Sequence, residues 1–179
     1  MSAETETELK LVADEAAIAA IVGNSSLFGG RTETRQVSTY FDTTDLALSA
    51  AGLSLRVRAI GDRRIQTVKA DRATMASLFA RAEWERDIDG DAPEPADLTE
   101  ALGKAPPDRL VPMFRTEVER VKTIFVLDDS KIEMVADRGC VVAGEAAGGA
   151  TAPIGEIELE LMAGDAVALF GLARRIARV

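Results

Sequence analysis

Short runs in which charged and apolar residues alternate recur along the chain and predict β-strands. In the first run, Glu6, Glu8 and Lys10 share one side of the extended chain, and Leu9 and Leu11 lie on the other. The run at 156–161 repeats this arrangement with three acids opposite three aliphatic residues. One such strand is typical of an exposed antiparallel sheet. Its repetition indicates a fold that needs a charged face on many strands.

The other elements follow from the same periodicity and from turn and cap residues. Besides strands at 4–12 and 156–161, we expect strands at 36–42, 53–58, 64–69, 81–88, 114–127 and 131–137. Helices are expected at 14–22, 43–51, 71–80 and 98–102, and from 165 to the end. Residues 144–149 predict a Gly/Ala-rich loop.

Two architectures can place charge on one face of nearly every strand. In an open sheet, helices would cover the apolar face and water would cover the charged one. In a closed barrel, the charged face would point inward and helices would surround an apolar exterior. The number of such strands and the complementary chemistry of their charges favour the barrel.

Composition narrows the function classes. With 179 residues, 47% of them hydrophobic and 28% charged, the chain predicts one soluble domain over 1–179. The net charge of −9 argues against nucleic-acid and anionic-membrane partners. Without histidine and with Cys140 alone, a zinc site of the usual type is excluded, so any metal is bound by oxygen. No signal peptide or spanning segment is visible, and we expect a cytoplasmic protein.

The charged faces combine two kinds of chemistry. Basic side chains of the sort that grip phosphate oxygens are Lys10, Arg56, Arg58, Lys69, Arg81, Arg120 and Lys122. Carboxylates suited to Mg²⁺ or Mn²⁺ are Glu6, Glu8, Glu156 and Glu158. Either set buried alone would be costly, whereas a polyanion with divalent cations between them would neutralise both.

The order of these residues resembles the CYTH superfamily, also called triphosphate tunnel metalloenzymes. The resemblance covers essentially the whole chain. It rests on Glu6-x-Glu8-x-Lys10, Tyr40-Phe41-Asp42-Thr43, Leu55-Arg56-Val57-Arg58, Lys69, Arg81-x-Glu83, Arg120-x-Lys122, Ile132-Glu133, Asp137 and 156–161. It implies an eight-stranded antiparallel β-barrel, in the α+β class, that binds triphosphate with divalent metal in a charged interior.

Within the superfamily the chain looks most like the bacterial inorganic triphosphatases, in which this domain often precedes a helical CHAD domain. This likeness implies metal-assisted hydrolysis of a terminal phosphoanhydride. The basic set would hold the triphosphate, the four glutamates would bind metal, and Lys10, Glu6 and Glu8 would take part in catalysis. Lys10 would contact phosphate or, with a lowered pKa, help to activate water. Residues that could position these groups are Glu83, Glu85, Glu133, Asp137 and Glu160.

Three functions compete. The favoured one is an inorganic triphosphatase acting on tripolyphosphate, with nucleoside triphosphates as further candidate substrates. The alternative is an adenylyl cyclase or a thiamine triphosphatase that uses the same interior. Those two need a site for an organic group, and with six Phe, one Tyr and one Trp the sequence shows no stacked aromatic set. A noncatalytic polyphosphate-binding module would not need the four metal-binding acids. The sequence leaves the oligomeric state open.

Overall fold

A computed structural model describes residues 4–70, 78–144 and 148–179. Within this part of the chain, twelve elements follow one another. They are β1 (Glu4–Val12), α1 (Glu15–Gly23), β2 (Arg31–Asp42), α2 (Ala47–Ala50), β3 (Leu53–Ile60), β4 (Arg63–Ala70), β5 (Leu78–Ile88), α3 (Pro95–Leu102), β6 (Val111–Leu127), β7 (Ser130–Ala143), β8 (Thr151–Ala163) and α4 (Val167–Ile176).

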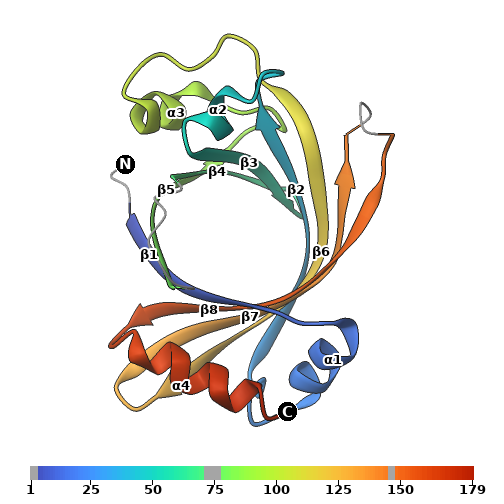
Figure 1. The fold of residues 1–179 in the computed structure, drawn as a ribbon, viewed down its shortest axis with the longest axis vertical. Coiled ribbons are helices and arrows are strands. Elements are labelled where there is room, and N and C mark those ends of the chain that lie inside the picture. Colours follow the sequence, from blue (N-terminus) through green and yellow to red (C-terminus); the bar gives the residue numbers. More distant parts are fainter. Residues whose placement is uncertain (1–3, 71–77, 145–147) are drawn as a thin grey trace.

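Every neighbouring pair of strands is antiparallel, and the sheet returns on itself. The strand order is β1-β5-β4-β3-β2-β6-β7-β8, and β1 also pairs with β8, so the sheet is a closed barrel (Figure 1). Closure leaves no unpaired sheet edge. The prediction of an eight-stranded antiparallel sheet with helices around it is confirmed for the described residues.

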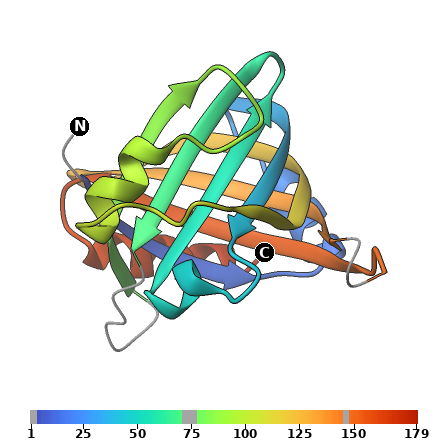
Figure 2. The same ribbon diagram turned by 90° about the horizontal axis from the view of Figure 1, so that it is seen from above.

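Two apolar clusters on the outer face hold the helices against the barrel. One joins Leu9 and Leu159 of the strands to α1 and α4, with Leu169 and Leu172 completely buried. The other joins β3 and β4 to α2 and α3. Figure 2 looks onto this second outer face, where α3 and the chain after it cross the strands. Because the apolar side chains lie outside, the alternate residues of each strand form the inner face.

Several element boundaries differ from the prediction. Residues 71–77 of the expected helix lie outside the described residues, but its end was wrong, because Leu78 already belongs to β5 and pairs with Leu9 of β1. Strands β2, β7 and β8 are longer than predicted, and the connected ends of β7 and β8 project from the barrel (Figure 1). The added residues alternate too weakly to be predicted as strand. They are strand because a long neighbouring strand forms hydrogen bonds with their backbone groups.

Candidate triphosphate and metal site

The inner face carries the charged residues that the sequence selected. By strand register, Lys10 lies opposite Glu158, Asp137 lies between Glu156 and Arg120, and Lys69 lies opposite Glu83. Residues distant in sequence therefore meet because adjacent antiparallel strands bring them to the same level.

Three acids form a compact group on β7 and β8. Carboxylate oxygens of Asp137, Glu156 and Glu158 all lie within 4.8 Å of one another. Carboxylate oxygens at this spacing suit a hard divalent cation such as Mg²⁺ or Mn²⁺. Glu156 and Glu158 were predicted as metal ligands, whereas Asp137 was predicted only to position other groups. Asp137 joins the group because it is the register partner of Glu156 on the neighbouring strand. No local sequence pattern reveals this pairing.

Lys10 forms ion pairs with two members of this group. Its Nζ lies 2.6 Å from Glu158 Oε1 and 3.4 Å from Glu156 Oε1. Burial disfavours the ammonium, but the charges of Glu158, Glu156 and Glu8 outweigh it, so the pKa of Lys10 lies above its ordinary value. Activation of water by a neutral Lys10 required a lowered pKa. With Glu158 and Glu156 beside it, the pKa of Lys10 is shifted in the opposite direction.

Arg120 joins the acid group from β6. Its Nε donates to Asp137 Oδ1 at 2.8 Å, and its Nη2 donates to Glu158 Oε2 at 3.1 Å. Asp137 is 3% exposed, so this contact lies almost out of water. Burial disfavours the charged guanidinium, but the hydrogen bond and charge of Asp137 outweigh it and raise the pKa of Arg120.

The pKa values of Glu156 and Glu158 on β8 are shifted in opposite directions. Burial favours the neutral form of Glu158, but Lys10 and Arg120 outweigh it and lower its pKa to about 2. Burial and the nearby charge of Glu158 raise the pKa of Glu156, although Lys10 acts the other way. Glu158 is therefore the permanently charged centre of the group.

Arg56 and Arg58 of β3 have different surroundings. The Nε atoms of both are buried and have no hydrogen-bond partner among the described residues. Burial, Arg56 and Arg120 lower the pKa of Arg58 to about 10. Arg56 also helps to lower the pKa of Glu158, so the arginine pair lies near the acid group. Like charges gathered with unused donors are suited to an anion.

The remaining predicted residues mostly form ion pairs along the same face. Lys69 Nζ lies 3.1 Å from Glu83, Lys122 Nζ lies 2.5 Å from Glu133, and Thr67 donates a hydrogen bond to Glu85. Glu8 is 6% exposed and acts electrostatically on Lys10. Glu160 lies at the level of Glu8 and Glu133.

Glu6 and Arg81 complete the predicted set. They are register partners on β1 and β5. Their side chains lie outside the described part of the structure.

The segment Tyr40-Phe41-Asp42-Thr43 shapes the end of β2. The Asp42 carboxylate accepts hydrogen bonds from the backbone N–H groups of Thr43, Leu48 and Ser49, which ties β2 to α2. Phe41 packs on the outer cluster, while Tyr40 takes the inner face. Tyr40 stacks on Phe114 of β6 with ring centroids 4.5 Å apart. This aromatic pair overturns the expectation that no stacked set exists, because cross-strand register created it.

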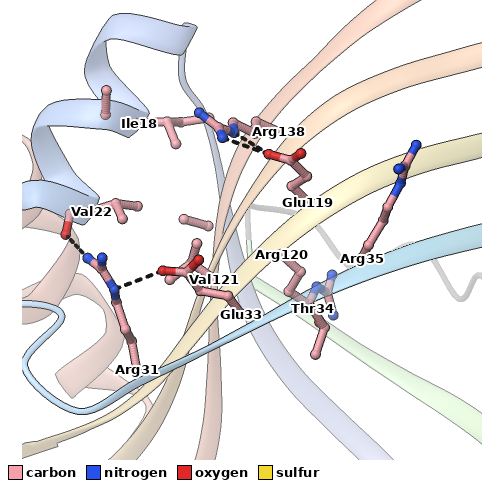
Figure 3. A pocket seen from close by; sticks show the side chains of 12 residues that line it. Ile18, Val22, Arg31, Glu33, Thr34, Arg35, Glu119, Arg120, Val121 and Arg138 are labelled. Atoms are coloured by element: carbon pink, nitrogen blue, oxygen red, sulfur yellow. Dashed lines mark hydrogen bonds and ion pairs between the residues drawn. The ribbon is translucent and has the colours of Figure 1, made fainter. Parts of the chain in front are cut away.

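A hollow of about 450 Å³ lies between α1 and strands β2, β6 and β7, and Arg120 of the inner face also lines it (Figure 3). Its charged lining is largely neutralised. Arg138 pairs with Glu119, and Arg31 pairs with Glu33 and donates to the carbonyl of Val22. These two arginines of the lining are thus paired within the protein, unlike the Nε atoms of Arg56 and Arg58.

Comparison with known families agrees with the resemblance found in the sequence. The sequence profile of the CYTH domain matches residues 4–179. The chain belongs to the CYTH domain family. An inorganic triphosphatase of Haemophilus influenzae is 31% identical over 136 residues, which cover 74% of this chain and 38% of that protein. This CYTH chain thus spans well under half the length of that relative.

Solved structures share the fold at low sequence identity. A Hippeastrum protein described as a candidate adenylyl cyclase with a dominant triphosphatase activity has a TM-score of 0.67 and 16% identity, over 97% of this chain and 86% of its own. A candidate adenylate cyclase of Bacillus halodurans has a TM-score of 0.64 and 14% identity, over 99% and 90%. At these identities the likeness concerns the fold alone. No helix in the described part of the chain is long and apolar enough to cross a membrane.

Proposed function

We propose that this CYTH domain hydrolyses the terminal phosphoanhydride of inorganic triphosphate with the help of Mg²⁺ or Mn²⁺. The observation that carries the proposal is the division of the inner face. Asp137, Glu156 and Glu158 offer clustered carboxylates, and nearby Arg56 and Arg58 have buried donors without partners. A polyanion accompanied by a divalent cation satisfies both sets at once.

The proposed roles follow from this division. The residues proposed to hold the phosphate chain are Lys10, Arg56, Arg58, Lys69, Arg81, Arg120 and Lys122. The residues proposed to hold metal are Glu6, Glu8, Glu156 and Glu158, now with Asp137. A bound divalent ion would supply neutralisation of charge on the phosphate oxygens, which is a major part of catalysis in phosphoryl transfer. Glu83, Glu85, Glu133 and Glu160 would position the basic side chains.

The ion pairs of Lys10 and Arg120 fit this assignment. Lys10 and Arg120 currently bind the same carboxylates that would receive the cation. A cation on those carboxylates would take over the neutralisation of Glu158 and leave both basic groups to bind phosphate oxygens. We also propose that residues 1–179 form one domain and that it acts in the cytoplasm on a small-molecule substrate.

The test is phosphate release from tripolyphosphate, ATP and thiamine triphosphate, each with Mg²⁺, with Mn²⁺ and with chelator. We expect metal-dependent release from tripolyphosphate, and loss of that release in the double variant Glu6→Gln/Glu8→Gln. Cyclic AMP and pyrophosphate formed from ATP without phosphate release would replace the proposal by a cyclase. Tight tripolyphosphate binding with no turnover would indicate a binding module, and unchanged turnover in the double variant would refute the metal assignment.

A further inference from the structure

The inner face carries one aromatic contact that binding of inorganic triphosphate does not use. The rings of Tyr40 and Phe114 are nearly parallel, with centroids 4.5 Å apart and planes inclined by 13°. They come from the paired strands β2 and β6, where Tyr40 and Phe114 are direct register partners. Neither residue belongs to the two apolar clusters that hold the helices outside the barrel.

This pair continues the row of arginines. Tyr40 lies opposite Arg56 on β3, so one level of the inner face runs from Arg56 through Tyr40 to Phe114. Tyr40 also lies close enough to Arg58 to act on its charge. A phosphate chain held by the two arginines would therefore end beside an aromatic surface.

Phe114 has the exposure expected of a surface that receives a ligand. It is 37% exposed, so part of its ring is accessible to a ligand. Its stacking on Tyr40 fixes the plane of the ring. A fixed, accessible aromatic face stacks favourably on a nucleobase.

We propose that Phe114 determines whether a triphosphate with a planar organic group is accepted, by stacking the base of a nucleoside triphosphate beside the phosphate chain. The inference rests on the proposed function, because it requires that chain to lie along Arg56 and Arg58. Tripolyphosphate has no ring, so Phe114 contributes nothing to its binding. The ligand class is a nucleoside triphosphate, with ATP as the probe.

The experiment compares Phe114→Leu with the parent protein for two substrates. Leucine keeps an apolar side chain but removes the ring. We expect the KM for ATP and the Kd of ATP measured by calorimetry to rise about tenfold, while the KM for tripolyphosphate stays unchanged. Phe114→Trp, which keeps an aromatic face, should retain ATP binding. The control is Ile124→Ala. Ile124 is an exposed apolar residue (42%) on the same side of β6 but far along the strand, so this variant should leave the KM for ATP and the KM for tripolyphosphate unchanged.

The outcomes separate this inference from the proposed function. Equal changes for ATP and tripolyphosphate would mean that Phe114 serves only the structure of the barrel, and the inference would be overturned. Tripolyphosphate turnover without any binding of ATP by the parent protein would also overturn it and leave the triphosphatase proposal standing. No turnover of tripolyphosphate together with ATP binding that depends on the Phe114 ring would refute hydrolysis but support the inference, which needs only the phosphate-binding part of the proposed function.

Discussion

Arg120 and Arg58 are two buried guanidinium groups on the same inner face, and their surroundings act on them in opposite ways. Arg120 binds Asp137 and Glu158, and these acids raise its pKa. Arg58 has an unpartnered Nε, and burial with two neighbouring arginines lowers its pKa to about 10. Arg120 is thus satisfied within the protein, while Arg58 is a group whose charge is best stabilised by a bound anion.

This comparison divides the barrel interior by function. The side formed by β1, β7 and β8 is rich in acids and neutralised by Lys10 and Arg120. The side formed by β3 keeps positive charge with unused hydrogen-bond donors. The first side is paired within the protein and is proposed to hold the metal, whereas the second keeps donors for the phosphate chain.

The largest effect is expected at Glu158, the acid that both Lys10 and Arg120 contact. Glu158→Gln should lower metal-dependent tripolyphosphate turnover by about 100-fold or more, because it removes a proposed metal ligand and frees two cations from their partner. Breaking this buried ion pair should also cost about 3 kcal/mol of unfolding free energy. Steady-state kinetics and urea unfolding check both effects. Turnover close to that of the parent protein would refute the role of Glu158.

At Arg58 we expect a loss of binding without a loss of stability. Arg58→Gln should weaken tripolyphosphate binding about 30-fold, equivalent to about 2 kcal/mol for charged hydrogen bonds. The ligand-free variant should unfold at the same or a higher urea concentration than the parent, since repulsion from Arg56 and Arg120 is removed. Calorimetry and urea titration measure the two quantities. A clearly destabilised ligand-free variant would show that Arg58 has a structural role instead.

Glu158 on the acid-rich side should make the free energy of unfolding depend on pH. The pKa of Glu158 is about 2 in the folded protein against 4.5 ordinarily, so its charged form stabilises the fold. That contribution is complete well above pH 4.5 and is lost as the pH falls toward 2. Between pH 7 and pH 3 the loss attributable to this residue is about 2 kcal/mol. Urea unfolding of the parent and of Glu158→Gln should therefore differ less at pH 3 than at pH 7; an equal difference would contradict the shifted pKa.

The smallest effect on tripolyphosphate binding is expected at Arg138, an arginine outside the barrel that can be compared with Arg58 inside it. Arg138 follows Asp137 on β7 but points to the outer face, where it pairs with exposed Glu119 (Figure 3). Arg138→Gln should leave tripolyphosphate binding and turnover unchanged, because an exposed ion pair is screened by water and contributes little. It also serves as a matched control for Arg58→Gln. Weakened binding in this variant would mean that general positive charge, and not the inner face, holds the ligand.

Much of the inner face could be predicted from local alternation. The charged residues of 8–10, 55–58 and 156–160 take the inner face because neighbours on a strand point to opposite sides, and this periodicity needs no tertiary information. The extra length of β2, β7 and β8 could not be predicted in the same way. Their added residues are strand because another strand pairs with them.

By itself the sequence determined which residues alternate, which elements form and which charges share a face, since these depend on a period of two along one strand. Only the tertiary structure decided that β1 closes the sheet against both β5 and β8, that Asp137 joins Glu156 and Glu158, and that Tyr40 stacks on Phe114. These contacts depend on the register between strands. Register is set by the pairing of whole strands distant in sequence, which no short segment encodes.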